Sequence, residues 1–128
     1  MADSIFTKII KGELPSNKIY EDDKNIAFLT IQPIQPGHTL VVPKKQIDPL
    51  WNLSDDDYIS LMIVSKKVAN RLRDVIGKKR VGVKVEGFEV AHAHIHLIPM
   101  DSVAEYTAPP RDATAVELAE MAQKLRFN

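Results

Sequence analysis

Three of the four histidines in the chain lie on every second residue of one stretch, EVAHAHIHLIPM at positions 89–100. They are His92, His94 and His96. The stretch is apolar between them and ends at Pro99, which predicts a β-strand over Val90–Ile98. Alternate side chains of a strand point to the same face, so the three imidazoles would lie together. The opposite face would pack into the core, and it consists of Ala91, Ala93, Ile95 and Leu97.

A metal site is one chemistry that this row could support, because histidine is a common ligand of zinc and copper. Side chains two residues apart on a strand are separated by about 6.5–7 Å, close enough for two rings to bind one ion. The outer two rings would be about 13 Å apart, so all three could not easily share it. A zinc site would therefore use two of these histidines with His38 or a carboxylate.

Phosphoryl transfer is the other chemistry that fits the row. A neutral imidazole is a competent nucleophile toward phosphorus, and a neighbouring ring can hold the phosphate or protonate the leaving group. Because the pKa of an unperturbed histidine is about 6.5, adjacent rings can occupy different protonation states near neutral pH. The row would then act as one attacking ring with helpers on both sides.

Composition excludes several classes of function. The chain has 128 residues with 17 basic and 17 acidic side chains, so no net charge attracts nucleic acid or an anionic membrane. It has no cysteine, which rules out disulfides and thiolate chemistry. The N-terminus, MADSIFTKII, is unlike a secretory signal, and no apolar run approaches the length of a membrane-spanning helix. We therefore expect a cytoplasmic protein.

The hydrophobic pattern predicts one α+β domain over residues 1–128, with a core of about 3–100 and a C-terminal extension. A mostly antiparallel sheet of about five strands and two to three helices is expected. Trp51 stands just before the main helix and is interpreted as a packing residue. The predicted helices are Ile5–Ile10 after an Asp3 or Ser4 cap, Ser54–Gly77, and about 112–127. The predicted strands are Lys18–Glu21, Asn25–Ile31, His38–Pro43, Val81–Val85 and Val90–Ile98.

The sequence HAHIHLI at 92–98 resembles the His-φ-His-φ-His-φ-φ motif of the histidine triad (HIT) nucleotide hydrolases and transferases. Two further blocks are similar to the Hint branch of that family: DSIFTKIIKGELP at 3–15 and PGHTLVVPK at 36–44. The resemblance runs from about residue 3 to Pro99 in the family's order. It implies a HIT-like fold.

The same resemblance implies roles for single residues. His94, the middle histidine, would attack the α-phosphorus and form a nucleotidyl-histidine intermediate. His96 would hydrogen-bond the phosphate, while His92 and His38 would orient the nucleophile. The nucleotide would be bound by residues of the first helix, the second strand and the loop before the triad: Ile5, Phe6, Ile9, Phe28, Thr30, Ile31 and Glu89.

Three positions depart from the family's pattern. Thr30 stands where an acidic residue or Asn commonly binds the ribose, and Val85 where an Asn commonly contacts the nucleotide. The glycine-rich loop before the triad is shortened to Gly87-Phe88-Glu89. If Glu89 faces the phosphate, its charge would oppose binding; it could equally face water.

We therefore expect a hydrolase of nucleoside phosphoramidates or related AMP or GMP conjugates. Its partner would be a purine nucleotide or nucleotidyl conjugate, and it would require no cofactor, although a bound zinc ion is possible. A homodimer is expected, because an open sheet edge invites self-pairing and the resemblance implies the same. Two alternatives are a nucleotide-sensing protein with weak turnover and a zinc-binding protein that uses His38 with two triad histidines.

Overall fold

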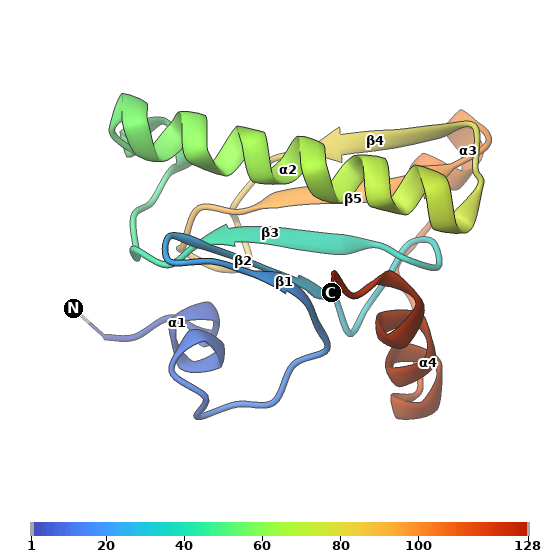
Figure 1. Ribbon diagram of the computed structural model, residues 1–128, viewed down its shortest axis with the longest axis horizontal. Coiled ribbons are helices and arrows are strands. Elements are labelled where there is room, and N and C mark those ends of the chain that lie inside the picture. Colours follow the sequence, from blue (N-terminus) through green and yellow to red (C-terminus); the bar gives the residue numbers. More distant parts are fainter. Residues whose placement is uncertain (1, 128) are drawn as a thin grey trace.

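The structure is a computed structural model that describes residues 2–127. Five strands form one antiparallel sheet in the order β1-β2-β3-β5-β4. The predicted α+β fold with a mostly antiparallel sheet of about five strands is therefore confirmed. The strands are β1 Lys18–Glu21, β2 Asn25–Leu29, β3 Thr39–Pro43, β4 Arg80–Lys84 and β5 Ile95–Met100. The helices are α1 Ile5–Ile10, the 3₁₀ turn η1 Leu50–Asn52, α2 Asp55–Ile76, α3 Val103–Tyr106 and α4 Ala115–Leu125. In Figure 1, α2 runs along the sheet, whereas α1 and α4 are short and lie apart from each other.

Capping residues begin the helices where the sequence predicts. The side chains of Ser4, Ser54 and Thr114 each accept a hydrogen bond from the third backbone N–H after them, and they begin α1, α2 and α4. Gly77 ends α2 with a left-handed φ of 76°, a conformation that glycine adopts without steric cost. None of the helices within residues 2–127 is long and apolar enough to cross a membrane.

The two faces of the sheet carry separate apolar cores, because successive residues of a strand point to opposite faces. Residues of β2 illustrate the division: Ala27 packs with α2 and α4, whereas Phe28 packs with α1. The core beneath α2 and α4 is large. The core beneath α1 has five buried residues, Phe6, Ile26, Phe28, Leu40 and Val42, with Ile9, Ile10 and Val90 packed against them.

The loop between β2 and β3 depends on Gly37. Its φ is 86°, and a side-chain carbon added there would collide with the Cδ1 atom of Ile76 at the end of α2. Any other residue would strain the backbone and push the loop away from α2. Gly37 thereby fixes the start of β3, and His38 is the next residue.

Three sequence predictions need correction. The predicted strand over Val90–Ile98 begins only at Ile95, and Ala91 is exposed rather than in the core. Trp51 does not pack in the interior: it is 74% exposed in the η1 turn, with its ring 6.3 Å from that of Tyr58. Residues 2–127 contain four α-helices rather than two or three, because α3 is a single turn that periodicity does not reveal.

Candidate active site

All four histidines gather on the α1 side of the sheet, although only His96 lies within a strand. The backbone before β5 turns away from the sheet, because Ala93 N–H donates to the Ile47 carbonyl and His92 N–H to the Val90 carbonyl. This turn brings the ring centroids of His94 and His96 to 5.0 Å, and those of His38 and His96 to 5.1 Å. The histidines therefore meet as predicted, but by a different backbone path from the strand that was predicted.

Hydrogen bonds fix the tautomers of His38 and His96. The Ile34 backbone N–H donates to His38 Nδ1 at 3.1 Å, so the proton of the neutral ring is on Nε2. That Nε2–H donates to His96 Nδ1 at 2.9 Å, which places the His96 proton on its own Nε2. Within the described residues, His96 Nε2 is buried and has no hydrogen-bond partner. Since buried N–H groups are normally satisfied, this atom is a donor available to a ligand.

A second chain of hydrogen bonds orients His94. Its Nδ1–H donates to the His92 carbonyl at 2.7 Å, which leaves the lone pair on Nε2. His92 in turn donates from Nε2 to the Pro43 carbonyl at 2.8 Å and accepts at Nδ1 from the Ser4 hydroxyl at 2.6 Å. Phe6 lies edge-on to both rings, 5.7 Å from His92 and 4.9 Å from His94 between centroids. His94 is therefore held in a defined orientation, in which Nδ1 is used within the protein and Nε2 is left free.

Burial keeps three of the rings neutral at pH 7. Desolvation, together with the positive charge of Lys84, lowers the pKa of His38 to about 4. Desolvation is also the largest cause for His96, whose pKa is lowered to about 3 with smaller contributions from His38, His94 and Lys84. Desolvation also lowers the pKa of His92, although its hydrogen bond to Pro43 opposes the shift. Neutral rings are what the two hydrogen-bond chains require, because a doubly protonated ring could not accept from Ile34 or Ser4.

Ser4 links the first triad histidine to α1, a connection that the sequence analysis did not anticipate. Its hydroxyl accepts from Thr7 N–H as the helix cap and donates to His92 Nδ1. Gln46 completes the cluster, because its Oε1 accepts from Ser4 N–H at 2.7 Å and from the Thr7 hydroxyl at 2.6 Å. The cap motif itself was visible in the sequence, but the contact with His92 spans 88 positions and no local pattern reveals it.

The residues predicted to bind the nucleotide divide into three groups: residues of the small core, exposed apolar residues and polar residues. Phe6, Phe28 and Ile9 belong to the small core, with the two rings 5.6 Å apart. Ile5 is 55% exposed and Ile31 is 70% exposed, so both are open to a ligand. The Thr30 hydroxyl accepts from Gln32 N–H at 3.2 Å, and Glu89 is exposed to solvent. Nothing in these contacts tests the predicted roles of Thr30 and Glu89.

Lys84 is a second residue that sequence reasoning missed. It lies opposite His96 in the β4–β5 register, and side chains of such pairs share one face of the sheet. It makes no ion pair or side-chain hydrogen bond within residues 2–127. Lys84 lies within the predicted strand Val81–Val85, but the sequence does not reveal which strand lies beside it.

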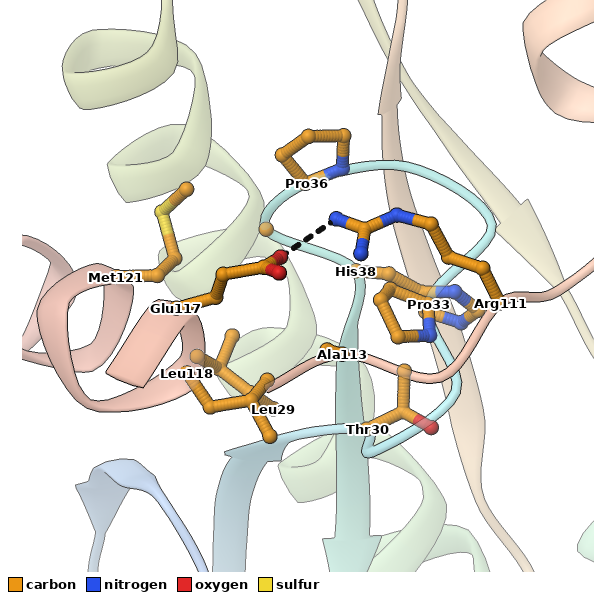
Figure 2. A pocket seen from close by; sticks show the side chains of 11 residues that line it. Leu29, Thr30, Pro33, Pro36, His38, Arg111, Ala113, Glu117, Leu118 and Met121 are labelled. Atoms are coloured by element: carbon orange, nitrogen blue, oxygen red, sulfur yellow. Dashed lines mark hydrogen bonds and ion pairs between the residues drawn. The ribbon is translucent and has the colours of Figure 1, made fainter. Parts of the chain in front are cut away.

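Figure 2 shows a cavity beside His38 that the C-terminal extension helps to enclose. Arg111 and Glu117 form an ion pair of 2.8 Å across it. The backbone N–H groups of Arg111 and Ala113 donate to the carbonyls of Pro33 and Ile31, which ties the extension to the β2–β3 loop. The other lining residues are Leu29, Thr30, Pro33, Pro36, Gly37, Ala113, Leu118 and Met121. The extension therefore supports the loop that presents His38.

The histidines do not converge as a metal-binding group. Within residues 2–127, no three His, Cys, Asp or Glu side chains are grouped closely enough to hold an ion. His38 Nε2 and His96 Nδ1 bond to each other, and His92 uses both nitrogens within the protein. A zinc ion bound through these atoms would have to displace the hydrogen bonds that order the rings.

Comparison with known proteins gives this geometry a context. The model of the HIT domain matches residues 11–103, which is most of the chain and includes all four histidines. The chain belongs to the histidine triad family. An uncharacterized HIT-like protein of Borreliella burgdorferi is 42% identical over 106 residues, covering 77% of this chain and 76% of its own length.

Two other HIT proteins resemble the chain over nearly its whole length. The adenosine 5'-monophosphoramidase HNT1 of Candida albicans is 35% identical, covering 98% of this chain and 90% of its own. The crystal structure of a Hit-like protein involved in cell-cycle regulation from Bartonella henselae superposes with a TM-score of 0.86. That protein is 32% identical, with coverage of 97% of this chain and 94% of the other. The α+β fold of this chain is thus the HIT fold.

Proposed function

We propose that this HIT protein hydrolyses nucleoside phosphoramidates, or related AMP or GMP conjugates, through a nucleotidyl intermediate on His94. One observation carries the proposal: the orphan Nε2–H of His96 lies beside a His94 whose Nε2 keeps its lone pair. A donor next to a nucleophile suits a phosphate, whose oxygen accepts from His96 while its phosphorus faces His94. The similarity to a named phosphoramidase supports the same reaction.

The reaction would proceed in two displacements. His94 Nε2 attacks the α-phosphorus, the bond from phosphorus to the leaving nitrogen breaks, and that nitrogen takes a proton from water. The imidazolium that forms is stabilised because its Nδ1–H already donates to the His92 carbonyl. Water then attacks phosphorus, the bond to His94 breaks, and AMP leaves. His96 would donate to the phosphate oxygen in both steps.

The nucleoside would lie over α1 and the end of β2. Phe6 and Phe28 would form the floor, and the exposed side chains of Ile5 and Ile31 would lie against the base. Burial of such apolar side chains under a purine ring is favourable, at about 25 cal/mol for each Å² removed from water. Ile9 would support the floor, and Thr30 would face the ribose.

Lys84 would supply the positive charge that the shortened loop does not. It lies opposite His96, it is exposed, and it has no ion-pair partner within the described residues. A phosphate bound at His96 would place its negative charge near this ammonium group. Glu89, on the exposed loop before the triad, would act in the opposite direction if it approaches the phosphate.

A homodimer joined through β4 is part of the proposal. The two edges of the sheet differ: the Lys18 and Ile19 carbonyls of β1 accept hydrogen bonds from Arg126 and Phe127, so the C-terminus covers that edge. The β4 edge instead presents Val83, which is 54% exposed. The Tyr106 hydroxyl donates to the Val83 carbonyl at 3.4 Å, so this edge is only partly covered, and a strand edge that is left open favours pairing with another copy. Light scattering should give about twice 14.4 kDa at micromolar concentration.

Adenosine 5'-phosphoramidate is the substrate that tests the function most simply. We expect AMP release by the wild-type protein, little release by His94→Asn, and unchanged release after treatment with EDTA. Tight binding of AMP without any release would support a nucleotide-sensing protein instead. Loss of activity on chelation, with one zinc per chain by elemental analysis, would contradict a reaction that needs no cofactor.

A further inference from the structure

His94 lines a cleft on the side away from the proposed nucleoside site. The cleft lies between the segment from Asp48 to Trp51 and the loop at 85–87, and its empty space, open solvent at the mouth included, is about 390 Å³. His94 is 6% exposed, and its Nε2 has no hydrogen-bond partner within residues 2–127. The other lining residues are Pro49, Leu50, Val85, Glu86, Gly87 and Ala93.

The register of the sheet places the cleft relative to the nucleoside. The Thr30 N–H donates to the carbonyl of His38, just before β3 begins. His96 lies opposite Leu40, two residues further along the same strand. His92 bonds to the carbonyl of Pro43, at the far end of the same strand. The cleft lies past the Pro43 end of β3, because one of its walls is the segment Asp48–Trp51, which follows β3 in the chain. A nucleoside near Thr30 would therefore leave the cleft free for the other half of a conjugate.

The side chains of the cleft favour a positive charge. Asp48 and Glu86 contribute two carboxylates, and neither forms an ion pair within residues 2–127. The Asp48 carboxylate lies against Gly87, since its Oδ1 is 3.7 Å from the place of a Cβ there. Trp51 adds an indole ring that is 74% exposed, and such a ring attracts cations to its face. Among residues 2–127, no lysine or arginine lines the cleft.

We propose that this cleft binds the amine half of the substrate and selects leaving groups that carry a second, positive charge. The inference rests on the proposed function, because it concerns the leaving group of that reaction. It also explains the position of Trp51, a large apolar side chain that the core does not use. The substrate class would be AMP conjugates of diamines or of other amines with a cationic tail.

Three adenosine phosphoramidates of equal length test the charge of the tail: those of 1,5-diaminopentane, hexylamine and 6-aminohexanoate. Their tails end in ammonium, methyl and carboxylate. We expect kcat/KM for the ammonium tail to exceed that for the methyl tail by about tenfold, as two exposed ion pairs and one cation–π contact would give. The carboxylate tail should react most slowly, and salt should reduce the differences.

Variants assign the preference to the cleft. The double variant Asp48→Asn with Glu86→Gln should bring the ratio of ammonium to methyl kcat/KM close to one, and Trp51→Leu should lower it in part. Asp56→Asn is the matched control, because Asp56 is an exposed acid in the first turn of α2 and does not line the cleft. It should keep the wild-type ratio.

The outcomes separate this inference from the proposed function. Release of AMP from all three conjugates at equal kcat/KM would overturn the inference and leave the function standing. A wild-type ratio in the double variant would also overturn it. If no conjugate releases AMP, the function fails. In that case the charge preference of the cleft is tested by binding, with the dissociation constants of the same conjugates for His94→Asn. Equal constants for the ammonium and methyl tails would overturn the inference.

Discussion

The two faces of the sheet are built on different principles. On the side of α2 and α4, apolar side chains such as Leu61, Val68 and Leu97 are completely buried and need no polar partner. On the side of α1, the apolar cluster is small, and its residue Phe6 packs edge-on against the rings of His92 and His94. Order on that side depends on hydrogen bonds as well as on packing.

This difference assigns stability to one face and chemistry to the other. The large core can hold the sheet while the histidine side keeps costly features, such as the buried Nε2–H of His96, which has no partner in the part of the chain that the structure describes. A change on the α2 side should therefore alter the free energy of unfolding and spare the chemistry of the folded protein. A change on the α1 side should alter the chemistry of the site in addition to any effect on the free energy of unfolding.

Leu61→Ala should produce the largest loss of stability. Leu61 is 0% exposed beneath α2, so its removal leaves a cavity and should cost about 2–5 kcal/mol of unfolding free energy. Urea unfolding measures this change, and kcat per folded molecule should stay close to the wild-type value. A large fall in kcat with unchanged stability would contradict the division between the two faces.

Acid should destabilise the α1 side before it affects the carboxylates. The pKa of His38 is about 4 in the folded protein and about 6.5 when unfolded, so the unfolded chain binds more protons below pH 6.5. Stability is thus fully present above pH 6.5 and is lost as the pH falls toward 4, by about 2 kcal/mol for this residue at pH 5. In His38→Gln, the unfolding free energy measured with urea should fall less steeply between pH 7 and 5, and the dependence that is left belongs to His96, whose pKa is also lowered. An equally steep dependence in that variant would place the proton uptake elsewhere.

Lys84→Met should weaken AMP binding by about fivefold to tenfold at low salt, because the phosphate loses a neighbouring positive charge. Arg80→Met is the matched control, since Arg80 lies on the same face of β4 but opposite Met100 instead of His96. Calorimetric titration in low and high salt should show an effect for Lys84 only, and one that salt reduces. Equal effects of the two variants would remove Lys84 from the site.

Ser4→Ala and Thr114→Ala should cost the same stability but differ in activity. Both residues cap helices, and the loss of a cap costs about 1 kcal/mol. Only Ser4 also donates to His92, so only Ser4→Ala should free that ring and lower kcat several-fold. Ser4→Thr keeps a hydroxyl at this position and should keep kcat near the wild-type value. If both alanine variants kept full kcat while unfolding more easily, the bond to His92 would have no catalytic role.

The large core was predictable because its signals are local. The capping residue Ser54, the 3.6-residue period and Gly77 fixed α2 almost to the residue, and β1 was predicted with its observed bounds. The family motif likewise pointed to the correct fold. Two core predictions were wrong. A bulky apolar side chain is usually buried, but Trp51 lines the cleft beside His94, and Ala91 is exposed because it lies before the start of β5.

The candidate site was less predictable because its order comes from distant parts of the chain. Alternation of histidines favoured a strand, but Ala93 bonds to Ile47 in place of a neighbouring strand, so the strand begins later. The contact of Ser4 with His92 and the register of Lys84 against His96 are also long-range. Periodicity records which face a residue occupies, and it carries no information about which segment lies opposite.

The most direct test of the central claim is to trap the intermediate. Wild-type protein mixed with an AMP phosphoramidate, quenched in the first turnover and digested, should give a peptide over residues 92–96 that carries the adenylyl group on His94. His94→Asn, whose side chain cannot attack, should give no such peptide while keeping its fold and its affinity for AMP. An adduct on His92 or His96, or rapid AMP release by His94→Asn, would contradict the account.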